Sequence, residues 1–273
     1  MGRKELAFAL TWQRNTQPVG TAMTDLLKYV GHRIGRPVVP RVAIAYDDLH
    51  VLFERGEADF AWLPPLSFLR LRSKDLVRTV VVNQRHGTRA FHAVLAVRSG
   101  SRHYALDRLQ GARAAWVDPF SASGYALQRI DLAARKIDPR TTFGEERFLG
   151  SHDAAARAVY EGRSDLVGTF AEYEGDRLAR AGFSTVGNAS EWRVVMRGRE
   201  VPSDTLAAHA SVEPSVRDAV KEALASALLD DATSRLVRDV FHVDAFGEAD
   251  DARYAALADV VEAARRDGLL PHF

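Results

Sequence analysis

The sequence predicts an α/β protein with two lobes, each built around its own sheet. Three observations lead to this prediction. Strand and helix patterns alternate up to about residue 95, alternate again from 96 to 197, and give way to nearly continuous helix from Pro214 onward. Such alternation is typical of parallel-type sheets whose faces are covered by helices. A chain of 273 residues is long enough for two lobes of ordinary size.

The first half opens on a strand and then alternates. Short apolar runs predict buried strands at 6–10, 38–45, 59–63, 77–82 and 91–97. Apolar periodicity and end signals predict helices between them at 22–30, from Asp47 to Gly56, and at 66–71.

The second half repeats the pattern after a short helix that starts at Leu106. Strands are predicted at 113–117, 147–149 and 165–168. Helices are predicted at 123–135, 152–161 and about 171–181.

Three further helices are predicted in the tail, at 216–229, 232–241 and 254–265. A helical tail cannot bury its apolar side alone, so we expect it to pack on the first lobe. The first lobe would then comprise residues 1–95 and 198–273, and the second residues 96–197. Two chain crossings would form the hinge between them.

Composition excludes several function classes. The 37 basic and 36 acidic residues are scattered and give a net charge of +1, so no basic stripe is available for nucleic acid. The absence of cysteine excludes disulfides, thiolate catalysis and zinc–thiolate sites. No run is long enough to span a membrane. Residues 1–6 lead straight into a strand and leave no room for the apolar segment of a signal peptide. We therefore expect a periplasmic or other extracytoplasmic protein if a leader has been removed, and a cytoplasmic protein if none has.

Two predicted helix starts carry small polar residues directly after a strand. The first is Ser121–Gly124 and the second is Gly150–Asp153, which contains His152. The first backbone amides of a helix have no partner within the helix, and together with hydroxyls and an imidazole they stabilise an anion. Serine and aspartate also cap ordinary helices. Ligands of open α/β sheets lie beyond the carboxyl ends of strands. Tyr46 follows the second strand in the corresponding place of the first lobe.

Together, several short segments resemble the phosphate/phosphite/phosphonate-binding family of ABC transporter solute receptors. The resemblance covers most of the chain, and the two helix starts are its most specific part. The segments are Tyr46, 56–61 (GEADFA), 98–101 (RSGS), 109–113 (LQGAR), 121–124 (SASG), 150–153 (GSHD) and 201–204 (VPSD).

The resemblance implies the type II periplasmic-binding-protein fold, with an anion bound in the cleft between the lobes. Ser121 and Ser123 would bind its oxygens, together with the amides of Ala122, Ser123 and Gly124. His152 would donate from the second helix start, and Tyr46 would add a hydroxyl from the other lobe. Glu172 and Asp204 would receive the ammonium of an amine-bearing phosphonate. The resemblance implies an ABC permease as partner if the protein is exported; we expect a monomer with neither cofactor nor metal.

Three positions depart from the family pattern. Ala122 stands where a threonine is common, and Phe91 and Ala93 stand where a tyrosine and a serine are common. Each charge-assisted hydrogen bond lost would weaken anion binding by about 1.5–3 kcal/mol. A less charged or larger ligand is therefore an alternative to phosphonate or phosphite.

Two other functions are compatible with the same residues. One is an acid/base enzyme of the lyase or dehydratase type, with His152 acting beside Asp118 or Glu172. Ser123 as a nucleophile lacks a recognisable neighbouring base. The other is a cytoplasmic sensor that signals ligand binding to a partner protein.

Overall fold

The computed structural model describes residues 4–11, 17–248 and 250–272, which form two compact units. Unit 1 comprises Met1–Arg89 and Ser203–Asp251, and unit 2 comprises Ala90–Pro202 and Ala252–Phe273. The chain therefore passes between the units three times. The sequence predicts that the whole tail belongs to the first lobe, whereas the tail from Ala252 onward groups with unit 2.

Unit 1 contains a mixed sheet with strand order β12-β4-β11-β3-β1-β2. β1 pairs in parallel with β2 and β3, while β11 and β12 join antiparallel. Every residue of β1 is buried, as its continuous apolar run predicts for a central strand. The strands are β1 (Leu6–Thr11), β2 (Val38–Ala43), β3 (Phe60–Leu63), β4 (Val77–Gln84), β11 (Thr205–His209) and β12 (Ala245–Gly247).

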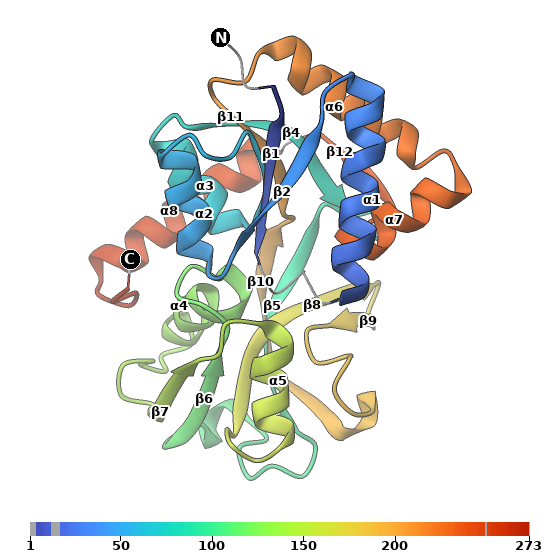
Figure 1. The fold of residues 1–273 in the computed structure, drawn as a ribbon. Helices are drawn as coiled ribbons and strands as arrows, with labels where there is room; N and C mark the ends of the chain where they lie inside the picture. Colours follow the sequence, from blue (N-terminus) through green and yellow to red (C-terminus); the bar gives the residue numbers. More distant parts are fainter. Residues whose placement is uncertain (1–3, 12–16, 249, 273) are drawn as a thin grey trace. The chain divides into compact units, whose positions relative to one another are not determined.

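Helices cover both faces of this sheet. In Figure 1, α1, α6 and α7 lie together on one side of it, and α2 and α3 lie on the other. Leu26 and Leu27 of α1 pack against Trp62 and Phe241, whose rings stack at 4.3 Å between centroids. The helices are α1 (Gln17–Ile34), α2 (Tyr46–Glu54), α3 (Pro65–Ser73), α6 (Pro214–Ala227) and α7 (Asp231–Phe241).

Unit 2 contains a second mixed sheet, with order β10-β5-β8-β6-β7 and β9 paired to β8. β6 lies between β8 and β7 and runs parallel to both, so the carboxyl ends of these strands meet at one edge. β5 is antiparallel to β8 and β10. The strands are β5 (Ala90–Arg98), β6 (Ala112–Trp116), β7 (Phe143–Phe148), β8 (Leu166–Glu174), β9 (Arg177–Ala181) and β10 (Trp192–Pro202).

The helices of unit 2 lie on opposite faces of the sheet. Ala115 and Val167 belong to the core under α5, whereas a Cβ on Gly168 would meet Trp116 and Gln128 on the α4 side. Short 3-10 turns occupy Leu106–Arg108 and Ala189–Glu191. The helices are α4 (Leu127–Ala134, preceded by a π-type turn at Ala122–Ala126), α5 (His152–Tyr160) and α8 (Asp251–Arg266).

Two predictions about these elements are wrong. The segment 171–181 is not a helix, because β8 and β9 form a hairpin closed by Gly175 and Asp176. Gly175 has a φ of 60°, which a two-residue hairpin loop with glycine in first place requires. The backbone of β8 also pairs with β5, so sheet hydrogen bonds outweigh the helical pattern. The second wrong prediction is that of parallel sheets: antiparallel pairs such as β5 with β8 and β11 with β3 make both sheets mixed.

None of the helices in the described part of the chain is both long enough and apolar enough to cross a bilayer.

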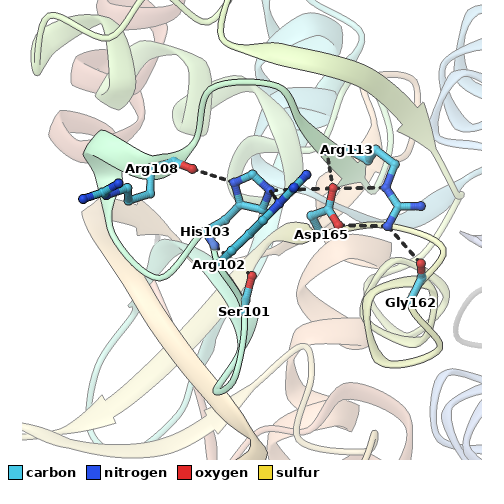
Figure 2. A network of polar contacts seen from close by, with 7 residues as sticks. All are labelled: Ser101, Arg102, His103, Arg108, Arg113, Gly162 and Asp165. Carbon is cyan, nitrogen blue, oxygen red and sulfur yellow. Dashed lines mark hydrogen bonds and ion pairs between the residues drawn. The ribbon is translucent and has the colours of Figure 1, made fainter.

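A polar network holds the amino ends of β6 and β8 together (Figure 2). Arg113 donates from its backbone amide and from Nε to Oδ2 of Asp165, at 2.9 and 3.0 Å, and from Nη2 to Oδ1 at 2.8 Å. The buried His103 must donate from Nδ1 to the Arg108 carbonyl at 2.5 Å, and its Nε2 accepts from Arg102. These bonds lie at the opposite end of the strands from the predicted site, and we assign them a structural role.

This network predicts a pH-dependent contribution to stability. The Arg113 hydrogen bonds lower the pKa of Asp165 from 3.8 to about 2, against an opposing effect of burial. A pKa lowered by folding stabilises the native state above about pH 4, and this contribution is lost as the pH falls towards 2. Because Arg113 is partly exposed, solvent screening limits the gain to roughly 1–2 kcal/mol.

We therefore expect Asp165→Asn to lower the free energy of unfolding at pH 7 and to lower it by clearly less at pH 2. Urea unfolding of both proteins at the two pH values measures this difference. Asp138→Asn, at an exposed pair with Arg140, is the control and should cost less at pH 7. An Asp165→Asn effect of equal size at both pH values would contradict the assignment.

Candidate anion-binding site

The first predicted helix start, Ser121–Gly124, lies just beyond the carboxyl end of β6 in unit 2. The chain turns at Asp118, whose carbonyl accepts from the Ser121 amide at 2.9 Å. Ser121 then caps the helix, since its hydroxyl oxygen accepts from the Gly124 amide at 3.0 Å. The Ala126 amide reaches back to the Ser121 carbonyl at 3.0 Å, which makes the first turn wide. The sequence pattern thus folds into a capped helix start, as predicted.

Ser123 provides the polar group best suited to a ligand. The residue is 3% exposed, and its hydroxyl has no hydrogen-bond partner within the described part of the chain. The amides of Ala122 and Ser123 lie in the first turn of the helix, where backbone amides have no partner within the helix. This helix start therefore offers one hydroxyl and two amides to an oxyanion.

Gly124 allows the close packing of this turn. A Cβ added there would lie 2.4 Å from Cγ2 of Val117 and 2.6 Å from the hydroxyl of Ser121. Any larger residue would push the turn away from β6 or break the Ser121 cap. The Gly124 amide itself is used by Ser121, so its expected contact with the ligand remains a prediction.

Gln128 fixes the helix start to the sheet and was not anticipated from the sequence. Its fully buried Nε2 donates to the Ser123 carbonyl at 2.6 Å and to the Val94 carbonyl of β5 at 2.9 Å. A polar residue on the buried side of a helix, one turn after the serines, is the signal that would have revealed it.

The second helix start brings His152 to the same edge of the sheet. The Gly150 amide donates to the Val117 carbonyl at 2.8 Å, which places the start of α5 beside the end of β6. Ser151 caps α5 by accepting from the Ala154 amide at 2.9 Å. His152 Nδ1 lies 2.7 Å from the Thr169 hydroxyl of β8. The two predicted helix starts are therefore neighbours in one unit.

Glu172 lies further along β8 and already has a cationic partner. Its two carboxylate oxygens accept from Nε and Nη2 of Arg180 on β9, at 2.9 and 2.7 Å. Glu172 is 4% exposed. A ligand ammonium at Glu172 remains a prediction, and it would have to compete with this guanidinium.

Tyr46 and Asp204 belong to unit 1. Tyr46 is buried and begins α2. The Asp204 carboxylate accepts from Trp62 Nε1 at 3.3 Å and lies 3.8 Å from Nη2 of Arg85. Their contacts with a ligand remain predictions.

The two departures on β5 are both buried. Ala93 lies opposite Phe170 of β8, and the Phe91 ring lies edge-on to the same phenylalanine at 6.2 Å between centroids. His152 also contacts the Phe170 ring, at 4.9 Å. The place where the family pattern has two hydroxyls is thus apolar and aromatic in this chain.

A comparison with known protein families shows which family this chain belongs to. The model of the family described as ABC transporter, phosphonate, periplasmic substrate-binding protein matches residues 8–254. The chain belongs to this family. The match covers both helix starts, and it supports the non-enzymatic interpretation because the family consists of transporter binding proteins.

Solved structures support the fold. The binding-protein component of a phosphonate ABC transporter from Pseudomonas aeruginosa has a TM-score of 0.81 at 15% identity, covering 97% of this chain and 88% of that one. PhnD1 from Prochlorococcus marinus, in complex with methylphosphonate, has a TM-score of 0.78 at 17% identity, covering 97% and 99%. A Xanthomonas citri protein bound to ATP has a TM-score of 0.74 at 18% identity, covering 97% and 99%. The similarity extends to type II periplasmic binding proteins and confirms the predicted fold class.

Proposed function

We propose that this receptor binds a small phosphonate, phosphite or phosphate at the carboxyl end of β6 in unit 2. The observation that carries the proposal is the helix start at Ser123, a residue 3% exposed whose hydroxyl makes no hydrogen bond within the described residues. The bond from the Gly150 amide to the Val117 carbonyl brings the helix start that contains His152 beside it. Leading amides and the helix dipole favour an anion at this position. The methylphosphonate complex of the Prochlorococcus relative supports a phosphonate ligand.

The number of donors is sufficient for a useful affinity. A micromolar dissociation constant corresponds to about −8 kcal/mol. Each charge-assisted hydrogen bond contributes about 1.5–3 kcal/mol before the costs of association. Unit 2 alone would supply four donors from its two helix starts: the amides of Ala122 and Ser123, the Ser123 hydroxyl and the His152 imidazole. Tyr46 of unit 1 is proposed as a further donor.

A thermal-shift screen tests the proposal. A ligand that binds only the native state at a hundredfold excess over its dissociation constant adds about 2.7 kcal/mol of stability. We expect phosphate, phosphite or methylphosphonate to raise the melting temperature, and acetate and succinate to leave it unchanged. If none of the phosphorus oxyanions raises it, the proposed function is wrong.

We also propose that the loaded receptor delivers its ligand to an ABC permease outside the cytoplasm. Family membership supports this partner and compartment. Subcellular fractionation of the protein expressed from its native gene tests it. Recovery only in the cytoplasm would favour the sensor alternative.

A further inference from the structure

The strand hairpin next to the candidate site contains a partly buried ion pair across two strands. Glu172 of β8 and Arg180 of β9 are directly opposite in the antiparallel register. Their two hydrogen bonds, at 2.9 and 2.7 Å, form the bidentate arrangement in which arginine holds a carboxylate most firmly. The Glu172 side chain is 4% exposed and that of Arg180 is 33% exposed. The carboxylate is thus neutralised from within the protein.

Phe170 connects this ion pair to the candidate site. The Arg180 guanidinium lies over its ring at 4.8 Å from the centroid, and His152 lies edge-on to the same ring at 4.9 Å. The ion pair and the imidazole that would bind the anion therefore share one aromatic side chain. An organic substituent projecting from an anion bound by His152 would meet Phe170 and the Arg180 cation on this side.

We propose that the Glu172–Arg180 pair makes the site select oxyanions whose organic substituent carries no ammonium group. The inference rests on the proposed function. An ammonium near Glu172 would be repelled by Arg180 or would have to displace it, and removing the partner of a buried carboxylate is costly. A short alkyl substituent would instead pack on Phe170 at no electrostatic cost. The resemblance to the family implied the opposite, an ammonium held by Glu172.

In unit 1, the other predicted ammonium partner also has an arginine within ion-pair distance, although without the bidentate hydrogen bonds. Asp204 accepts from Trp62 and has Arg85 at 3.8 Å. Arg85 is 6% exposed and is held by the carbonyls of Phe241 and His242 at the end of α7. Each carboxylate therefore has its cation in place within its own unit.

Ethylphosphonate and 2-aminoethylphosphonate test this inference, because they differ only in the amino group. Isothermal titration with the wild-type protein should show at least tenfold tighter binding of ethylphosphonate. Arg180→Gln should reverse this order, since a ligand ammonium can then pair with Glu172. The double variant Glu172→Gln/Arg180→Gln should lose the gain in 2-aminoethylphosphonate affinity. The control Arg163→Gln removes an arginine of an exposed pair with Glu161 and should leave the order unchanged.

The outcomes separate the two proposals. Wild-type protein that binds phosphate or ethylphosphonate, and binds 2-aminoethylphosphonate as well or better, overturns the selectivity while the proposed function stands. Wild-type protein that binds no phosphorus oxyanion overturns the proposed function itself. If Arg180→Gln does not fold, the ratio of the two affinities in the wild-type protein decides.

Discussion

Ser123→Ala is expected to weaken phosphonate binding about ten- to a hundredfold, because one hydrogen bond to an anion is worth about 1.5–3 kcal/mol. His152→Ala should weaken binding by at least a factor of ten, and the double variant should bring affinity close to the limit of detection. The Ser123 hydroxyl makes no hydrogen bond within the described residues, so its removal should change the melting temperature of the unliganded protein little. Isothermal titration with the anion identified by thermal shift gives the affinities.

Ser164→Ala is a matched control. Ser164 is a buried serine of the same unit whose hydroxyl also lacks a hydrogen-bond partner, but it lies before the amino end of β8. Its removal should leave the affinity unchanged. Equal losses for Ser123→Ala and Ser164→Ala would mean that stability, and not contact with the anion, governs binding. Unchanged affinity in both Ser123→Ala and His152→Ala would place the site elsewhere.

Local signals predicted most of the fold. The apolar run of β1 and the amphipathic pattern of α7 place these elements within one or two residues of their observed bounds. The pattern failed at 171–181, where pairing with β5 and a turn at Gly175 decide the structure. The periodicity of a segment carries no information about strands from distant parts of the sequence that pair with it. The mixed strand directions were missed for the same reason.

Local signals also located the two helix starts of the candidate site, because a cap depends on residues within one turn. They did not reveal which polar groups are already satisfied. From the sequence, the Glu172 carboxylate is a candidate partner for a ligand ammonium. The β8–β9 hairpin shows that this carboxylate already accepts hydrogen bonds from Arg180. Gln128 and Thr169 were overlooked because their roles depend on contacts with β5 and α5.

Gln128→Ala should have the largest effect on stability among these variants. Truncation leaves the carbonyls of Ser123 and Val94 without this donor and opens a cavity at a fully buried position. Each unsatisfied buried group costs about 1–3 kcal/mol, so we expect a loss of about 2–4 kcal/mol in the free energy of unfolding. Anion affinity should fall as well, because Gln128 sets the position of Ser123. Gln110→Ala is the control, since Gln110 donates to the Thr141 carbonyl at an exposed site and should cost under about 0.5 kcal/mol.

Gln128→Met separates packing from positioning. Methionine has nearly the same length, and it removes both the donor and the Gln128 Oε1 that has no partner within the described residues. It should therefore recover the part of the stability that depends on volume. Affinity should stay reduced if the hydrogen bond to the Ser123 carbonyl holds the helix start in place. Affinity restored together with stability would show that Gln128 acts through packing alone, and the Ser123 turn would then owe its position to Gly124 and the Ser121 cap.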